Sequence, residues 1–325
     1  MKALVMNQAG SFENASVIEM LDPTPSANTI RVKVQAIGLN PVDYKLIENG
    51  FEGWNYPRPL GLDAAGIIDA LGGDVKGWRK GERVYFHSDI TKPGVSSEYV
   101  IVPEHTLSRI PDGISFEVAA SLPCPAFTAY QAVFQKLRLH KNDIILIHGG
   151  SGAVGGYSIQ FAKNFGAKVI ATASPRNYES AKAIGADWVL DYRDPNLAKT
   201  VSEITSHNGV RAVIDTIGGH STIQAFSMID YFGEIVCVAG LPDSDKIPHF
   251  EKSFSLHEIA IGAAFTSENV RAQTELSRIG SVVMNLLVSG ALKPLPIETI
   301  SLSEIPDALF RLRSRKTTRK IVARI

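Results

Sequence analysis

Cysteine, charge of one sign and long hydrophobic runs are all scarce in this chain of 325 residues. Its two cysteines, Cys124 and Cys237, are too far apart for a zinc knuckle or a disulfide scaffold, which predicts a reducing, cytoplasmic compartment. The 33 basic and 33 acidic residues cancel, so net charge favours neither nucleic acid nor an anionic membrane surface. The first apolar stretch, residues 3–6, is too short for a signal peptide, and no run approaches the roughly 18 apolar residues that span a bilayer. We therefore expect a soluble protein without a nucleic-acid or membrane partner.

Two patterns of hydrophobic residues divide the chain. Up to about residue 122, short β-branched runs are separated by Gly and Pro, and residues 29–37 alternate apolar and polar side chains. This pattern predicts an all-β region, folded as a small barrel or a twisted sheet. From about residue 125, short apolar runs alternate with helical stretches, which is typical of βαβ units and a parallel sheet. Two helices, at 275–289 and 303–314, and a strand at 320–325 are expected to follow.

A glycine-rich segment connects one apolar run to a helical pattern. Gly150, Gly152 and Gly155 follow the expected strand 143–147 at GxGxxG spacing and open a helix that extends to Lys163. In such a segment the first glycine allows the tight turn, the second lets backbone approach a pyrophosphate, and the third lets helix and strand pack closely. Because strand, turn and helix occur in this order, we expect a dinucleotide phosphate to bind here. The residues involved are Gly150, Ser151, Gly152, Ala153, Val154 and Gly155.

The end of the next expected strand distinguishes NADP from NAD. NAD enzymes usually place Asp or Glu there to bind the ribose hydroxyls. This strand ends at Ser174-Pro175-Arg176, and no acid occurs before Glu179. A hydroxyl and a guanidinium suit a 2′-phosphate, so we predict NADP(H). The alternative is that Arg176 is an ordinary solvent-exposed loop residue.

Seven stretches together resemble the medium-chain dehydrogenase/reductase superfamily, and within it the zinc-free, quinone-oxidoreductase-like branch. They cover almost the whole chain in the family's order: residues 38–45, 59–66, 81–85, 149–155, 184–187, 213–215 and 319–322. The resemblance implies an α/β protein in which a GroES-like β-barrel catalytic domain, 1–123 and 266–325, carries an inserted Rossmann domain, 124–265. It also implies a ligand site in the cleft between the domains and a homodimer. We expect residues 259–265, an apolar segment, to be a sheet edge that contacts the partner subunit, or else an ordinary internal strand.

The resemblance also bears on metal content. Zinc-dependent members hold catalytic zinc with a Cys in the segment that matches residues 38–43, a His-Glu pair that matches Leu62-Asp63, and a Cys or Asp beyond Ala120. The first two segments of this chain contain neither thiolate nor imidazole, and the four cysteines of a structural zinc lobe are absent. Because zinc needs about three such protein ligands for catalysis and four in a structural site, we predict no zinc.

Without a Lewis acid to stabilise an alkoxide, simple alcohol oxidation becomes difficult, whereas a conjugated acceptor delocalises the developing charge. We therefore predict NADPH-dependent hydride transfer to a quinone or an α,β-unsaturated carbonyl compound. One alternative is an enoyl-thioester reductase, which needs a longer groove. A non-enzymatic alternative is a structural or regulatory protein that binds NADPH without turnover.

The resemblance implies that the loop at residues 40–44 meets the nicotinamide. Asn40, Asp43 and Tyr44 are its candidate catalytic residues, with the Asn40 amide bonding substrate or cofactor and the Tyr44 phenol donating to a developing oxyanion. Many quinone reductases, however, carry their tyrosine one position later, where this chain has Lys45. The alternative is that Tyr44 is a core or surface aromatic and Asp43 a turn or helix-cap residue.

The remaining cofactor contacts are expected by position. We expect Thr128 to direct its hydroxyl toward the nicotinamide and Tyr192 to reach the adenosine ribose or its phosphate. Backbone groups at the end of one strand and in a following segment are expected near the nicotinamide amide: Val238, Ala239, Gly240, Phe265 and Thr266.

Overall fold

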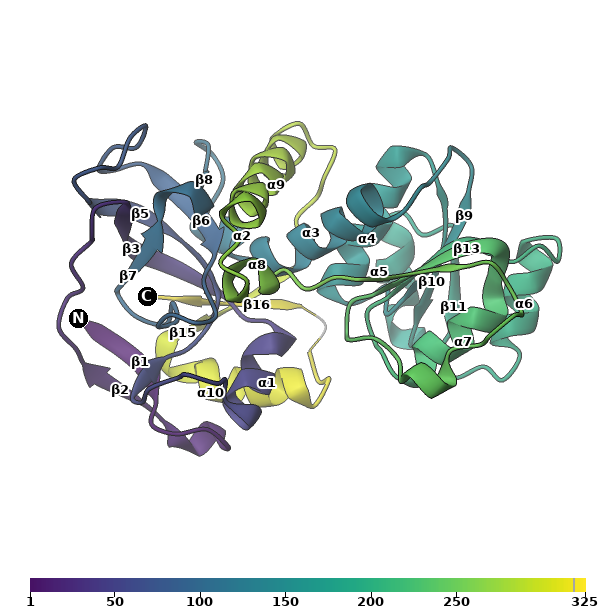
Figure 1. The fold of residues 1–325 in the computed structure, drawn as a ribbon, viewed down its shortest axis with the longest axis horizontal. Helices are drawn as coiled ribbons and strands as arrows, with labels where there is room; N and C mark the ends of the chain where they lie inside the picture. The colour runs from purple at the N-terminus through teal and green to yellow at the C-terminus, as the bar shows by residue number, and fades with distance from the viewer. Residues whose placement is uncertain (318) are drawn as a thin grey trace. The chain divides into compact units, whose positions relative to one another are not determined.

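The computed structural model describes residues 1–317 and 319–325 and divides them into two compact units (Figure 1). The first unit contains residues Met1–Phe127, Ile261–Val288 and Pro294–Ile325, and the second contains Thr128–Ala260 and Ser289–Lys293. The domain boundaries expected at 124 and 265 stay a prediction. No helix in the described ranges is long and apolar enough to cross a membrane.

The first unit is built on two β-sheets. One sheet has the order β2-β1-β4, and the other has the order β15-β16-β3-β5-β6-β8, with β7 paired to β3. The strands are β1 Lys2–Met6, β2 Ala15–Glu19, β3 Thr29–Gly38, β4 Arg58–Pro59, β5 Asp63–Leu71, β6 Arg83–His87, β7 Tyr99–Pro103, β8 Ser108–Arg109, β15 Ile297–Ser301 and β16 Lys320–Arg324. The predicted alternation along β3 is present, because Ile30, Val32 and Val34 are all fully buried or nearly so.

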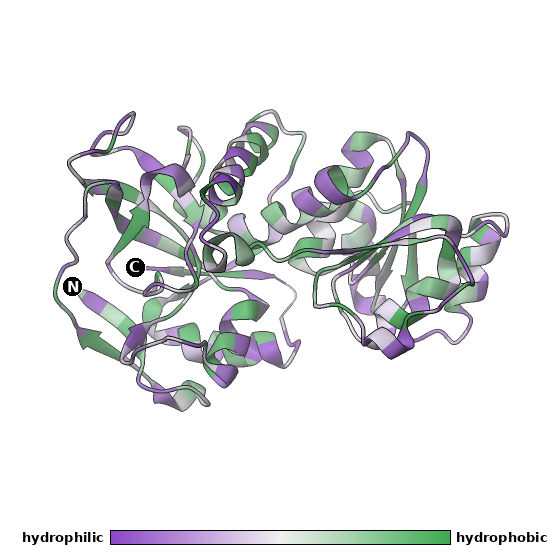
Figure 2. Cartoon of the chain, viewed as in Figure 1, coloured by the Kyte–Doolittle hydropathy of each residue, from purple (hydrophilic) through white to green (hydrophobic). Residues whose placement is uncertain are grey.

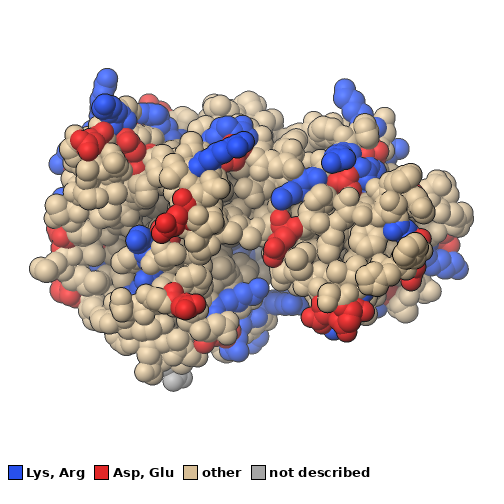
Figure 3. All heavy atoms as spheres, viewed as in Figure 1, with Lys and Arg blue, Asp and Glu red and all other residues tan. Residues whose placement is uncertain are grey.

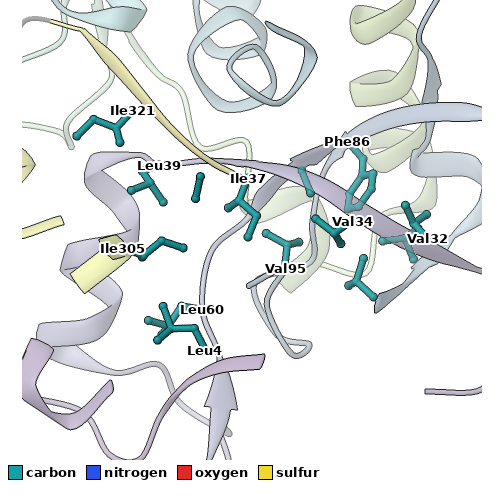
Figure 4. Close-up of a cluster of buried hydrophobic side chains, with 14 of the residues drawn as sticks. Leu4, Val32, Val34, Ile37, Leu39, Leu60, Phe86, Val95, Ile305 and Ile321 are labelled. Carbon is teal, nitrogen blue, oxygen red and sulfur yellow. The ribbon is translucent and has the colours of Figure 1, made fainter. Parts of the chain in front are cut away.

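Strand β16, from the end of the chain, pairs antiparallel with β3, so that Val322 lies opposite Gly38. This pairing brings residues near 40 and near 320 together in one sheet. The apolar side chains of both chain ends form a common core, in which Ile305 and Ile321 pack with Leu4 and Leu39 (Figure 4). Burial of such side chains is the main stabilising contribution to this unit.

Helices of the first unit include two that the sequence analysis did not expect. The helices are α1 Pro41–Asn49, α2 Phe116–Ala120, α8 Ala263–Thr266, α9 Val270–Val288 and α10 Ile305–Arg313. Helix α3, Pro123–Tyr130, begins in this unit and ends in the second, where a π-helical turn, Gln131–Lys136, follows it. The prediction of an all-β region up to residue 122 was therefore wrong at α1 and α2. Helix α1 forms because Asn40 is its N-cap, Pro41 occupies the first turn, and the Asp43 carboxylate accepts the Asn40 backbone N–H.

The second unit contains one six-stranded parallel sheet with the order β11-β10-β9-β12-β13-β14, the strand order of a dinucleotide-binding Rossmann fold. Its elements are β9 Ile144–His148, α4 Ala153–Phe165, β10 Lys168–Ala173, α5 Tyr178–Ala183, β11 Trp188–Asp191, α6 Leu197–Ile204, β12 Val210–Asp215, α7 His220–Met228, β13 Ile229–Cys237 and β14 Ser255–Glu258. The inner strands contain buried apolar runs (Figure 2), as expected for strands covered on both faces: 145–147, 169–171, 212–214 and 235–237.

The segment 259–265 is not a strand, so the prediction of a sheet edge or an internal strand was wrong, and its contact with a partner subunit stays a prediction. The sheet ends at β14, and the backbone N–H of Ile259 makes the last bond to the neighbouring strand, on the Cys237 carbonyl. A turn and the short helix α8 follow, and Ile259 and Phe265 are buried within the chain. The apolar character that suggested a sheet edge thus reflects internal packing.

Candidate functional site

The glycine turn of the second unit connects β9 to α4, as predicted. Two hydrogen bonds hold it against β10: Gly150 N–H donates to the Thr172 carbonyl at 2.9 Å, and Gly149 N–H donates to the Thr172 hydroxyl at 3.3 Å. The Thr216 hydroxyl, just after β12, donates to the His148 carbonyl at 2.8 Å. The turn is therefore fixed from both neighbouring strands before any ligand binds.

The roles of the glycines differ in part from expectation. The tight turn is made by Gly149, whose φ is 74°, and not by Gly150. Gly150 instead permits close packing, because a Cβ there would lie 2.7 Å from the Cβ of Ala171. Gly155 allows α4 to approach the turn, since its Cβ would lie 2.9 Å from the Gly149 carbonyl carbon.

Gly152 caps α4 and is exposed, and a Cβ added there would approach only the Gly149 carbonyl oxygen, at 3.3 Å. The first N–H groups of the 13-residue helix, beginning at Ala153 and Val154, have no partner within the helix. They give this end a positive partial charge that suits a phosphate group. These features fit the pyrophosphate of a dinucleotide, with Ser151 and Gly152 beside it.

The residues after β10 are connected to this turn by Asn177, which the sequence analysis did not select. Its side-chain N–H₂ group donates to the hydroxyls of Ser151 and Ser174, both at 3.2 Å. Arg176 is exposed on the same short 3₁₀ segment, Pro175–Asn177. The structure thus brings Ser174 and Arg176 to the turn, and the only sequence signal for Asn177 was its place beside them.

The remaining candidate cofactor contacts lie at several places. Tyr192 follows β11 and is 53% exposed, with the Arg193 guanidinium 5.6 Å from its ring centre. Val238, Ala239 and Gly240 lie just beyond β13, which ends at Cys237, and not within it.

Thr128 is buried on α3, and Phe265 and Thr266 lie on α8. The cofactor roles of these residues stay predictions.

A buried polar network in the first unit surrounds the predicted catalytic loop. The Asp63 carboxylate is fully buried and is the centre of the network. Its Oδ2 accepts from the Asn40 amide at 2.8 Å and from the Cys124 backbone N–H at 2.9 Å, and its Oδ1 lies 2.7 Å from His87 Nδ1. Three chain segments are therefore joined through one carboxylate.

The positive charge of the network comes from Lys320, which the sequence analysis also missed. Its ammonium group donates to the Leu39 carbonyl at 2.7 Å and to Asn40 Oδ1 at 2.5 Å. Burial lowers the pKa of Lys320, while the nearby charge of Asp63 raises it again. No signal in the sequence identified a lysine on the apolar strand β16 as a buried charge.

The Asn40 amide is largely occupied in this structure. Both of its N–H bonds are in use, one to Asp63 and one to the Gly38 carbonyl at 3.2 Å, and its oxygen accepts from Lys320. Only a second lone pair on that oxygen is left for a ligand. The role of Asn40 toward substrate or cofactor stays a prediction, and the structure shows it holding the loop.

Asp43 combines a structural contact with an unusual ionisation. Its Oδ2 accepts the Asn40 backbone N–H at 2.7 Å, which makes it the cap residue that the alternative interpretation expected. Burial, and secondarily the nearby negative charge of Asp63, raises the pKa of Asp43 to about 7, although the Asn40 bond and Lys320 act in the opposite direction. Tyr44 is partly buried against the core of the first unit.

The donor set around Asp63 does not fit a zinc ion. Asn40 offers an amide that is already bonded, burial raises the pKa of the Cys124 thiol well above its usual value, and the Lys320 ammonium adds a positive charge. Among the described residues, no group of three His, Cys, Asp or Glu side chains is placed to hold a metal ion.

Two family models match the chain. Residues 26–112 match the alcohol dehydrogenase GroES-like domain, and residues 153–279 match a model described as zinc-binding dehydrogenase. The first confirms the predicted GroES-like domain, and the second covers most of the predicted Rossmann domain.

Known proteins give the same result. A quinone oxidoreductase of Pongo abelii is 31% identical over 225 residues, and the match spans about two thirds, 66%, of each chain. A quinone oxidoreductase structure from Pseudomonas syringae pv. tomato has a TM-score of 0.89 and 27% identity, covering 100% of this chain and 99% of that one. The Escherichia coli quinone oxidoreductase complexed with NADPH has a TM-score of 0.88 and 25% identity over 100% of both chains. This chain therefore belongs to the medium-chain dehydrogenase/reductase superfamily, in its quinone-oxidoreductase-like branch.

Proposed function

We propose that this protein is an NADPH-dependent, zinc-independent oxidoreductase that transfers hydride to a quinone or an α,β-unsaturated carbonyl compound. The observation that carries the proposal is the glycine turn with its exposed helix N-terminus, followed after β10 by a hydroxyl and a guanidinium but no carboxylate. The similarity to quinone oxidoreductases, one of them complexed with NADPH, supports it.

Ser174 and Arg176 are proposed to bind the 2′-phosphate of NADPH, with Asn177 holding Ser174 to the turn. A guanidinium pairs with phosphate in bidentate geometry and has no such partner in NADH. We expect Arg176→Ala to raise the dissociation constant of NADPH about tenfold or more, while that of NADH changes little. Lys182→Ala removes an exposed cation from the neighbouring helix α5 and is the matched control. Equal dissociation constants of the native protein for NADPH and NADH would contradict the assignment.

Hydride transfer from bound NADPH needs an acceptor whose developing charge is stabilised. The donor set around Asp63 is unsuited to zinc, and its Lys320 ammonium group is already bonded to Asn40. A conjugated acceptor delocalises the charge over its own atoms and requires less stabilisation from the protein. The protein's main contribution is then to align the hydride donor with the acceptor. Metal analysis checks this point, and one equivalent of tightly bound zinc would refute it.

The acceptor class is tested by following NADPH consumption with a panel of quinones, enones and enoyl thioesters. We expect turnover with members of the first two classes. Preference for enoyl thioesters would favour the enoyl-thioester reductase, and tight NADPH binding without turnover on the whole panel would favour a structural or regulatory protein.

A homodimer in the cytoplasm is the proposed state of the protein. Strand β14 ends the parallel sheet of the second unit, and an open sheet edge needs covering. On the face in Figure 3, basic and acidic side chains are interspersed over both units, which matches the zero net charge. Light scattering that gives the mass of a single chain, 35.2 kDa, would contradict the dimer.

A further inference from the structure

One carboxylate oxygen in the first unit has no hydrogen-bond partner in the part of the chain that the structure describes. Asp43 is 3% exposed, and its Oδ2 is bonded to the Asn40 backbone, but its buried Oδ1 is bonded to no described group. A buried, ionised oxygen without a hydrogen-bond partner costs free energy, whereas a protonated oxygen can donate a hydrogen bond to a bound molecule. The geometry therefore favours a carboxylic acid that has a proton to give.

Asp43 also lines a pocket that belongs entirely to the first unit. The pocket has a volume of about 270 Å³ including its opening to solvent, and Trp54, Arg58 and Leu62 contribute to its wall. The Arg58 guanidinium lies 4.2 Å from the Trp54 ring centre and donates to the Ile90 carbonyl at 3.1 Å, so this part of the wall is held in place. The pocket opens to solvent and has room for a water molecule near the acid.

The charges that face Asp43 come from several elements. Those that act on it are Asp63 on β5, His87 on β6 and Lys320 on β16, with the Cys124 thiol of α3 nearby and the side chains of Arg58 and Lys92 in the pocket wall. The Asp63 carboxylate lies within hydrogen-bond distance of the Asn40 amide, His87 Nδ1 and the Cys124 backbone N–H, whereas Asp43 Oδ1 has no such contact among the described residues. Burial and the neighbouring carboxylate both favour the neutral form of Asp43, so this carboxyl group retains its proton.

We propose that Asp43 supplies the proton that the reduction consumes, and that pocket water restores it. The inference rests on the proposed function. A hydride, with its electron pair, leaves C4 of NADPH and forms a C–H or O–H bond on the acceptor, while the nicotinamide is oxidised. The proton leaves Asp43 Oδ1 for the acceptor's developing anion, directly or through one water, and the resulting carboxylate regains a proton from solvent by way of pocket water. A pKa of about 7 lies near the working pH, where an acid both gives and regains a proton readily.

Asp43→Asn tests the inference because the amide oxygen can still accept the Asn40 N–H bond. We expect kcat with the best acceptor to fall about a hundredfold, in the range of general acid catalysis, while the dissociation constant of NADPH stays within about twofold. In the native protein kcat should fall as pH rises through about 7, because the acid ionises, and this decrease should be absent in the variant. Asp307→Asn is the matched control: Asp307 also lies in the first turn of a proline-initiated helix, α10, but is exposed.

A kcat within about threefold of native, or an unchanged pH profile in Asp43→Asn, would overturn the inference. If that variant does not fold, Asp43→Ser keeps a capping hydroxyl without the acid. The titration is also measured without turnover, by NMR of native protein carrying ¹³C-labelled aspartate. Absence of a carboxyl carbon that titrates near pH 7 would overturn the inference. A native protein that is inactive on every acceptor would instead contradict the proposed function, and the titration of Asp43 could still be measured in it.

Discussion

The glycine turn of the second unit and the Asp63 network of the first unit are built in opposite ways. The turn uses backbone groups of consecutive residues, Gly149 to Gly155, between one strand and one helix. The network uses side chains from four strands or helices, and its partners Asn40 and Lys320 are 280 positions apart in the chain. A site made of local backbone is visible in a sequence, whereas a site made of distant side chains exists only after folding. Substitutions should therefore affect them differently: in the network they act mainly on stability, and in the turn mainly on binding.

The largest effect is expected for Asp63→Ala. The substitution leaves the Asn40 amide, His87 and the Cys124 N–H without their acceptor and leaves the buried Lys320 charge uncompensated. Leaving a buried charge without a nearby opposite charge typically costs about 3–5 kcal/mol. Urea unfolding, followed by tryptophan fluorescence, should show a loss of this size.

Asp69→Ala is the control for this measurement. Asp69 lies on the same strand, β5, but its ion pair with Arg31 is partly exposed, so we expect a loss of about 1 kcal/mol or less. If both variants lose similar amounts of unfolding free energy, the Asp63 network stabilises the protein no more than a partly exposed ion pair does.

The second effect is a pH dependence of stability that comes from Asp43. Its pKa in the folded protein, about 7, lies above the ordinary value of 3.8, so between these values the folded state holds a proton that the unfolded state has lost. Stability must therefore fall as pH rises from about 4 to about 7, by up to about 4 kcal/mol for this group. The measurement is the free energy of unfolding of the native protein and of Asp43→Asn at several pH values. As pH rises from about 4 to 8, the native protein should lose stability relative to the variant. A difference that is independent of pH would show that Asp43 ionises normally.

The third effect belongs to the turn and should leave stability unchanged. Gly152 has φ −78° and ψ 169°, which alanine adopts without strain, and an added methyl group would meet only the Gly149 carbonyl oxygen, at 3.3 Å, so that a shift of a few tenths of an ångström accommodates it. It would, however, stand beside the exposed helix N-terminus where a pyrophosphate is proposed. Gly152→Ala should weaken NADPH binding about tenfold to a hundredfold, or roughly 1.4 to 2.7 kcal/mol, with Tm within about 1 °C of native. Gly73→Ala, at an open position of the first unit, is the control, and a large loss of Tm in Gly152→Ala would mean that the turn is as structurally demanding as the network.

The same contrast explains what the sequence allowed us to predict. The strand, turn and helix from β9 to α4 and the alternation in β3 follow from local patterns, and the structure contains them. Lys320 was missed because a lysine before an apolar run is normally solvated, and only the pairing of β16 with β3 buries it. Helix α1 was missed for another reason: Asp43 was considered as a catalytic group or a cap residue, but the capping-box spacing of Asn40 and Asp43 was not used to predict a helix. The apolar segment 259–265 fits a strand pattern, but short apolar runs do not distinguish a strand from buried turns and helix ends.

The smallest effect should come from Asn177, where a side chain assists the local turn. Asn177→Ala removes the two bonds to Ser151 and Ser174 and leaves both hydroxyls in place, so the turn and the residues after β10 lose a connection but no contact with a ligand. One or two partly exposed hydrogen bonds contribute about 0.5–1 kcal/mol, so NADPH binding should weaken only about twofold to fivefold. The informative measurement is the ratio of dissociation constants for NADPH and NADH. Loss of the bond to Ser151 weakens the binding of both cofactors, and loss of the bond to Ser174 weakens only that of NADPH, so the ratio should change much less than in Arg176→Ala. If Asn177→Ala changes the ratio as strongly as Arg176→Ala, Asn177 itself contacts the 2′-phosphate. Recognition of the cofactor would then depend on a side chain that only the folded structure reveals, as the Asp63 network does.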